Sequence, residues 1–315
     1  MIMKTRLYRR KWMLTLPLIL LFAGSCTKEN NNSSGGNTIT DVVSGNASFS
    51  LLKTAVVKAG LATTLSGSGT FTVFAPDDNA FQTSGISAST IGSLSSDQLK
   101  NILLYHTLTS KIMSADVPAG PNASVKAANG GELFVTKNSS GVFVNGVKVT
   151  QADVPASNGV IHVINRVLLP PAGNLVQVAQ SDTGFSYLVA AVLRASQGST
   201  NVAQVLSGNG PFTVFAPTNQ AFRNAGFSSE AAINAADPNT LAAILTYHVI
   251  GARVFSSDLV NGAMVTTLNG GKVTIGLTNG ATVKGNSNKT ASAIIATNIM
   301  ATNGVVHVID QVLLP

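Results

Sequence analysis

The sequence contains a single cysteine, Cys26, among its 315 residues. One thiol cannot form an internal disulfide, and Cys-rich zinc sites and iron–sulfur clusters need several. Charged residues are also scarce at 10%, against roughly 25% in an average soluble domain. The polar surface must therefore come largely from Ser, Thr, Asn and Gly, which is more typical of β-rich exported proteins than of cytosolic enzymes.

The formal net charge of +7 does not indicate a nucleic-acid partner. No acidic residue precedes Glu29, and five of the 20 basic residues lie in the first eleven positions. Without those five, 15 basic residues face 13 acidic residues, which is a net charge of +2. Because the excess positive charge belongs to the extreme N-terminus, we exclude nucleic-acid binding.

The apolar run from Trp12 to Ala23 is 12 residues long, whereas a membrane-spanning helix needs about 20. It follows a basic segment and precedes Gly24, Ser25 and Cys26. This order resembles a bacterial lipoprotein signal, in which cleavage before the cysteine leaves that residue to carry lipid, although Ala23 stands where such signals usually have Leu. We expect residues 1–25 to be a signal peptide and Cys26 to be lipidated. Ordinary secretion with an incidental cysteine is the alternative.

Residues 27–37, TKENNNSSGGN, have no apolar periodicity. Such Gly/Ser/Asn-rich segments behave as flexible chains, so residues 26–37 are expected to form a tether from the lipid. The start of this tether also resembles the short export tags of some surface lipoproteins. We therefore expect a cell-envelope lipoprotein of the outer membrane, and the tag indicates exposure at the cell surface.

The rest of the chain is an internal repeat with a spacing of about 140 residues, which is too long for a solenoid. Both copies end in Val-Leu-Leu-Pro. We infer two tandem domains, at residues 38–170 and 174–315. Three motifs recur in the same order: Thr72–Pro76 as Thr213–Pro217, Tyr105-His106 as Tyr247-His248, and Asn158–Ile164 as Asn303–Ile309.

Helices and strands are expected in the same order in both copies. Apolar residues at helical spacing predict helices at 48–59 and 185–195. Short strands are predicted at Phe71–Phe74 and Phe212–Phe215, each ended by a proline. One further helix is then expected to lead into each Tyr-His pair.

The second half of each copy has a β pattern. Asn129–Gly131 and Asn269–Gly271 predict hairpin turns. The closing strands, Val160–Leu169 and Val305–Leu314, alternate poorly and are mostly apolar. This pattern is typical of a strand that is buried on both faces.

The three recurring motifs together resemble the fasciclin-like (FAS1) domain family. The resemblance covers both copies and implies an α+β fold, in which each domain is a wedge of two β-sheets flanked by helices. Family members are mostly extracellular adhesion or matrix modules. The resemblance implies a non-enzymatic protein with no cofactor.

All four histidines lie in the recurring motifs, so Tyr105, His106, Tyr247 and His248 are candidate binding residues, and His162 and His307 are candidate structural residues. A metal or catalytic pair in each domain is one interpretation. We favour the other, in which each buried imidazole bonds to backbone, because zinc needs three or four ligands. Copy one has Asp77 and Asp78 nearby, but copy two has no carboxylate there. No metal site is therefore expected.

A second candidate binding site lies before each Asn-Gly turn. In animal members of the family, an Asp-Ile pair at this place is linked to integrin binding. The resemblance places that pair at Asp153-Val154 in copy one. In copy two, Asn298-Ile299 replaces the carboxylate with an amide. The interpretation that we favour is that Asp153 and Asn298 are turn residues that bond their own backbone.

No nucleotide-binding or hydrolase motif is present in the sequence. We predict a lipid-anchored adhesion or binding module for extracellular matrix, polysaccharide or a protein ligand. A non-enzymatic periplasmic ligand-binding or envelope-assembly protein is the alternative, and an enzyme is the third interpretation.

Overall fold

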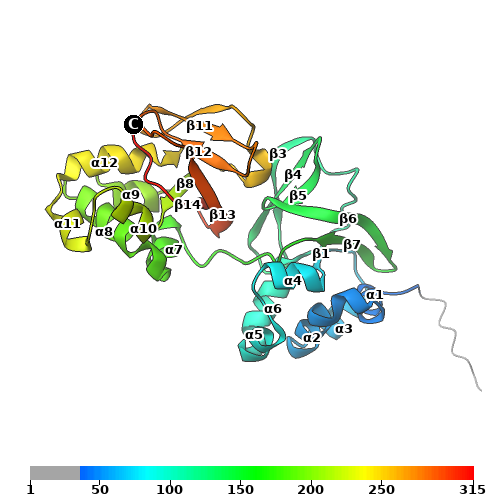
Figure 1. Ribbon diagram of the computed structural model, residues 1–315. Coiled ribbons are helices and arrows are strands. Elements are labelled where there is room, and N and C mark those ends of the chain that lie inside the picture. The colour runs from blue at the N-terminus through cyan, green and yellow to red at the C-terminus, as the bar shows by residue number, and fades with distance from the viewer. Residues whose placement is uncertain (1–35) are drawn as a thin grey trace, which may run out of the picture. The chain divides into compact units, whose positions relative to one another are not determined.

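A computed structural model describes residues 36–315 of the chain (Figure 1). The expected signal peptide, Cys26 and most of the expected tether lie outside the described residues. The described residues belong to one compact unit. No helix within residues 36–315 has the length and apolar character that crossing a membrane requires.

The first copy begins with helices and ends with strands. Its helices are α1 (Ile39–Gly45), α2 (Ser50–Lys58), α3 (Ala62–Ser66), α4 (Asp78–Thr83), α5 (Ala88–Ser93) and α6 (Ser96–Tyr105). Its strands are β1 (Phe71–Pro76), β2 (Thr107–Leu108), β3 (Gly120–Lys126), β4 (Glu132–Asn138), β5 (Gly141–Val144), β6 (Val147–Ala156) and β7 (Gly159–Ile164).

The second copy repeats this order. Its helices are α7 (Leu175–Ser181), α8 (Ser186–Ala195), α9 (Val202–Ser207), α10 (Asn219–Asn224), α11 (Glu230–Ala235) and α12 (Pro238–Tyr247). Its strands are β8 (Phe212–Pro217), β9 (Val249–Ile250), β10 (Met264–Thr266), β11 (Lys272–Gly276), β12 (Thr282–Lys284), β13 (Ser292–Ala301) and β14 (Gly304–Ile309).

Seven strands form the β part of each domain. Their order is β2-β1-β7-β6-β5-β4-β3 in the first domain and β10-β11-β12-β13-β14-β8-β9 in the second. The long strand β6 bends at two register shifts and pairs with β7 in one sheet and with β5 in the other. Strand β13 has the same role. Because bulges bend a strand, each domain is a wedge of two sheets, and the predicted α+β fold is confirmed.

The two motif strands of each domain pair in parallel, β1 with β7 and β8 with β14. All six residues of β7 and of β14 are buried. Helices pack against one face of these strands, and the other face lines the wedge. Figure 1 shows the helices of each domain gathered on one side of its strands. The prediction of strands buried on both faces is confirmed.

Glycine begins both closing strands because the neighbouring strand leaves no room for a side chain. A Cβ atom on Gly159 would collide with the carbonyl oxygen of Phe71. A Cβ atom on Gly304 would collide with the carbonyl oxygen of Phe212 in the same way. The Asn-Gly pair of the third motif therefore permits close approach of the two strand backbones.

Three expectations about the elements were wrong. The closing strands end at Ile164 and Ile309, five residues before the predicted ends. Three helices, rather than one, separate β1 from the first Tyr-His pair. Helices α1 and α7 were not predicted. Each of these two helices has only seven residues, which is too short to show a helical period clearly.

Candidate functional site

Each Tyr-His pair lies at the end of a helix, where His106 caps α6 and His248 caps α12. The Nδ1 atom of His106 is 2.8 Å from the carbonyl oxygen of Ile102, and its Nε2 accepts a hydrogen bond from the backbone N–H of Leu168 at 2.9 Å. Because Nε2 is an acceptor, the proton resides on Nδ1 and is donated to the carbonyl. Burial lowers the pKa of His106 to about 4.

The second copy repeats this arrangement. His248 Nδ1 lies 2.8 Å from the carbonyl oxygen of Ile244, and Leu313 N–H donates to Nε2 at 2.8 Å. Burial lowers its pKa to about 4 as well. Each neutral imidazole thus links the end of a helix to the Leu-Leu-Pro segment that closes its domain.

The two tyrosines are fully buried beside these histidines. Tyr105 donates its hydroxyl hydrogen to the carbonyl oxygen of Glu132 at 2.9 Å and accepts from Asn145 Nδ2 at 3.0 Å. Burial raises the pKa of Tyr105 to about 12. Tyr247 donates to the carbonyl of Lys272 and accepts from the N–H of Asn286. The Tyr-His pairs therefore present no free polar group to a ligand.

His162, in strand β7, has the opposite tautomer. Its Nδ1 accepts from the N–H of Asp153 at 3.2 Å, so Nε2 carries the proton that is donated to the carbonyl of Ile112 at 2.9 Å. Asp153 sits at a bulge of β6 with φ +61°. Its carboxylate accepts from the N–H of Ser114 at 2.8 Å and from the Ser114 hydroxyl at 2.5 Å. Desolvation opposes ionisation, yet these two bonds bring the Asp153 pKa below its usual value.

Asn298 takes the place of Asp153 in the second domain, with φ +64°. Its Oδ1 accepts from the N–H of Ser256 at 2.8 Å, and its Nδ2 donates to the Ser256 hydroxyl at 2.7 Å. A carboxylate in the first copy and an amide in the second therefore bond to serines at equivalent positions, Ser114 and Ser256. Asn and Asp are among the few residues that tolerate the left-handed region.

The remaining members of the candidate set are placed within the fold. Val154 and Ile299 are partly buried and pack against the helical cores of their domains. His307 Nε2 lies 2.9 Å from the carbonyl oxygen of Val254. Its Nδ1 atom is buried and has no hydrogen-bond partner within the described residues. Burial lowers the His307 pKa. Across residues 36–315, no three His, Cys, Asp or Glu side chains gather as a metal site would require.

Two motif residues have a role that the sequence did not reveal. Asn158 Oδ1 accepts from the N–H of Ile39 at 2.9 Å, while its Nδ2 donates to the carbonyls of Leu65 at 2.8 Å and Gly67 at 3.0 Å. One buried amide thus joins the start of α1, the end of α3 and the start of β7. Asn303 makes the same three bonds in the second domain. The recurrence of Asn before Gly was the available signal, but it was interpreted as a turn.

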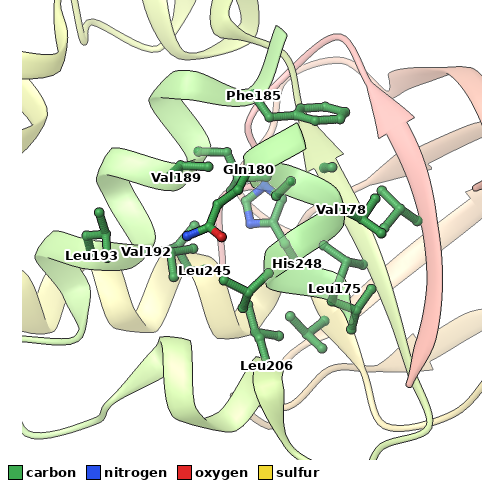
Figure 2. A pocket seen from close by; sticks show the side chains of 17 residues that line it. Leu175, Val178, Gln180, Phe185, Val189, Val192, Leu193, Leu206, Leu245 and His248 are labelled. Carbon is green, nitrogen blue, oxygen red and sulfur yellow. The ribbon is translucent and has the colours of Figure 1, made fainter. Parts of the chain in front are cut away.

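The second domain also contains an apolar pocket between its helices and strands (Figure 2). The hollow measures about 650 Å³ when its open mouth is included. Its walls come from α7, α8 and α9, and its floor from β8, β14 and the end of α12. Gln180 and His248 are the two polar side chains that line it, and no charged side chain does.

Comparison with known proteins identifies the family. The family model described as "Fasciclin domain" matches residues 47–170 and 184–315. The chain belongs to the fasciclin family. Its two fasciclin domains contain the sheets, the Tyr-His pairs and the Asn-Gly motifs described above.

Individual relatives come from bacteria and animals. Protein sll1483 of Synechocystis is 46% identical over 139 residues, which is 42% of this chain and 74% of that protein. Transforming growth factor-beta-induced protein ig-h3 of Sus scrofa is 28% identical over 80% of this chain. Human periostin is 29% identical over 80%. The chain spans 35% of the length of ig-h3 and 29% of that of periostin.

A solved structure is also similar, a FAS1 domain pair from the insect cell adhesion molecule Fasciclin I. It aligns with a TM-score of 0.41 and 19% sequence identity. The alignment covers 88% of this chain and 96% of that chain.

Proposed function

We propose that this chain is a lipid-anchored binding protein of a bacterial cell envelope, whose two fasciclin domains hold a protein or glycan ligand at the cell surface. Fasciclin domains occur in adhesion and ligand-binding proteins. The anchor is the lipid proposed for Cys26, and the outer membrane is the proposed location. Integrin binding is not part of this proposal, because the carboxylate of Asp153 is held by Ser114 and is replaced by an amide in the second domain.

One observation supports binding rather than catalysis. The polar side chains that both domains share in their motifs are buried, and they bond mainly to backbone groups of their own domain. General acid–base and nucleophilic catalysis need such groups within reach of a substrate. In these domains the recurring residues maintain the fold, and the exposed surface is available to contact a partner.

An array of glycans and matrix proteins, probed with residues 27–315, tests this proposal. We expect saturable binding to at least one glycan or protein class. Failure to bind any arrayed ligand, together with turnover of a chromogenic ester or glycoside, would contradict a non-enzymatic binding role.

A periplasmic ligand-binding protein is the second candidate, and the apolar pocket of the second domain favours it. Small-molecule sites are concave and mostly apolar, with few polar groups. Binding of a small molecule without binding to any arrayed macromolecule would favour this candidate.

The anchor leads to a direct prediction. Replacing Cys26 by serine removes the only thiol that lipid could modify. We expect the Cys26→Ser protein to leave the membrane fraction and appear in the soluble fraction, because a signal peptide alone provides no mature anchor. Immunoblots of fractionated cells measure this shift. A Thr27→Ser variant, which keeps the thiol, is the matched control and is expected to stay with the membrane. Membrane retention of the Cys26→Ser protein would contradict lipid anchoring.

A further inference from the structure

The two domains differ at one equivalent place, the space enclosed by their first three helices. Ile39 and Leu175 correspond, because their N–H groups bond to Asn158 and Asn303 in the same way. The sequence Phe-Ser occurs at the start of both α2 and α8, as Phe49-Ser50 and Phe185-Ser186, so these two helices can be aligned from that point. Counting from these anchors makes the two hollows comparable residue by residue.

In the first domain the hollow is small and partly polar. It measures about 320 Å³ and is lined by residues of α1, α2 and α3 alone. Thr40, Ser44 and Lys53 contribute polar groups to its wall. The Lys53 ammonium lies 3.5 Å from the carbonyl oxygen of Ser44, so this side chain extends from α2 to α1.

In the second domain the same positions are less polar. Val176 replaces Thr40, Val189 replaces Lys53, and Gln180 replaces Ser44. The hollow of the second domain also reaches the central strands and His248. Figure 2 shows Gln180 on the near side of the pocket and His248 behind it. Leu193, at the mouth, is 54% exposed.

The lining determines which occupant is compatible. No charged side chain lines the pocket, and His248 is neutral at pH 7 because burial lowers its pKa. An ionic group placed inside would lose its hydration without gaining an opposite charge. The space is a crevice between closely packed side chains, and an extended chain of methylene groups fills such a crevice better than a rigid polar ring.

We propose that the pocket of the second domain binds the alkyl chain of an uncharged, single-chain amphiphile. The methylenes lie among the aliphatic side chains between α7 and α8, and the neutral head group lies at the mouth beside the amide of Gln180. The first domain lacks this site because Lys53 lines the corresponding hollow and carries a charge to its wall.

Straight-chain 1-alcohols from butanol to dodecanol are suitable probes. Titration into residues 27–315, which include the whole compact unit, is followed by calorimetry and by methyl chemical shifts. We expect affinity to rise about fourfold per added carbon, which corresponds to about 0.8 kcal/mol per buried methylene, and to level off when the pocket is full. The shifts are expected at Val178, Val192 and Leu206.

Two variants and one control test the location. Val189→Lys introduces the lysine of the first domain, and Ala179→Leu fills the pocket without charge. Both are expected to weaken decanol binding at least tenfold while thermal melting shows that the second domain remains folded. The control is Val57→Lys, which changes an exposed residue of the first domain at the position equivalent to Leu193. This variant is expected to leave decanol binding unchanged.

Three results would overturn the proposal. The first is equal decanol binding by the parent protein and by both folded pocket variants. The second is a set of methyl shifts centred on Val56 and Val43 of the first domain. The third is tighter binding of decanoate than of decanol at pH 7, because it would show that the site recognises a charged head group.

Discussion

Replacing Asn158 by alanine is expected to destabilise the first domain by about 3 kcal/mol or more. The change removes three hydrogen bonds and leaves the N–H of Ile39 and the carbonyl of Leu65 without partners in a buried environment. A buried polar group that loses its partner costs about 1–3 kcal/mol. Urea unfolding, followed by circular dichroism, measures the loss as a shift of the first domain's transition to lower denaturant.

Asn303→Ala is the matched variant in the second domain. It should destabilise that domain to a similar extent and leave the first domain's transition in place, because the two amides make the same bonds within their own domains. A third variant, Asn79→Asp, changes an exposed amide that makes no side-chain hydrogen bond within residues 36–315 and should have little effect. A loss below 1 kcal/mol in Asn158→Ala would show that the amide does not hold α1 and α3 to the strands.

Acid is expected to destabilise both domains as the pH falls from about 6.5 towards 4. His106 and His248 have an ordinary pKa of 6.5 in the unfolded chain, and burial lowers it to about 4 in the folded domains. The unfolded state therefore binds protons first, so stability is complete above pH 6.5 and is lost below it. At 1.36 kcal/mol per pKa unit, each histidine contributes about 3 kcal/mol to this loss.

Urea unfolding at a series of pH values measures this dependence. His106→Ala lowers the stability of the first domain at pH 7 because the bonds to Ile102 and Leu168 are lost, but it should flatten that domain's response to acid between pH 6.5 and 4. The second domain keeps His248 and should keep its response. An unchanged pH dependence in His106→Ala would show that this imidazole titrates normally in the folded domain.

The parts of the fold that could be predicted share a local cause. The apolar closing strands and the hairpin turns each depend on residues close together in the chain. The structure has turns at Asn129–Gly131 and Asn269–Gly271. The three motifs recur in the same order in both copies and resemble the fasciclin family. That resemblance implies the arrangement of the sheets in each domain.

The parts that were missed depend on distant residues. Helix α1 has seven residues and is held by Asn158, which lies 119 positions away in the sequence. The pocket depends on which side chain stands at position 189 or 53 and on which helices surround it. Neither a local pattern nor a family motif specifies that space, so only the assembled domain reveals it.

Binding by the tandem and by its separate halves tests the central claim most directly. Residues 38–170 and 174–315 each contain a complete set of motifs, and we expect each half to unfold cooperatively on its own. For the ligand found on the array, the account predicts that the tandem binds at least tenfold more tightly than either half, since two linked contact surfaces reinforce each other. Failure of the tandem to bind any surface ligand more tightly than an unrelated protein of similar charge would contradict the account.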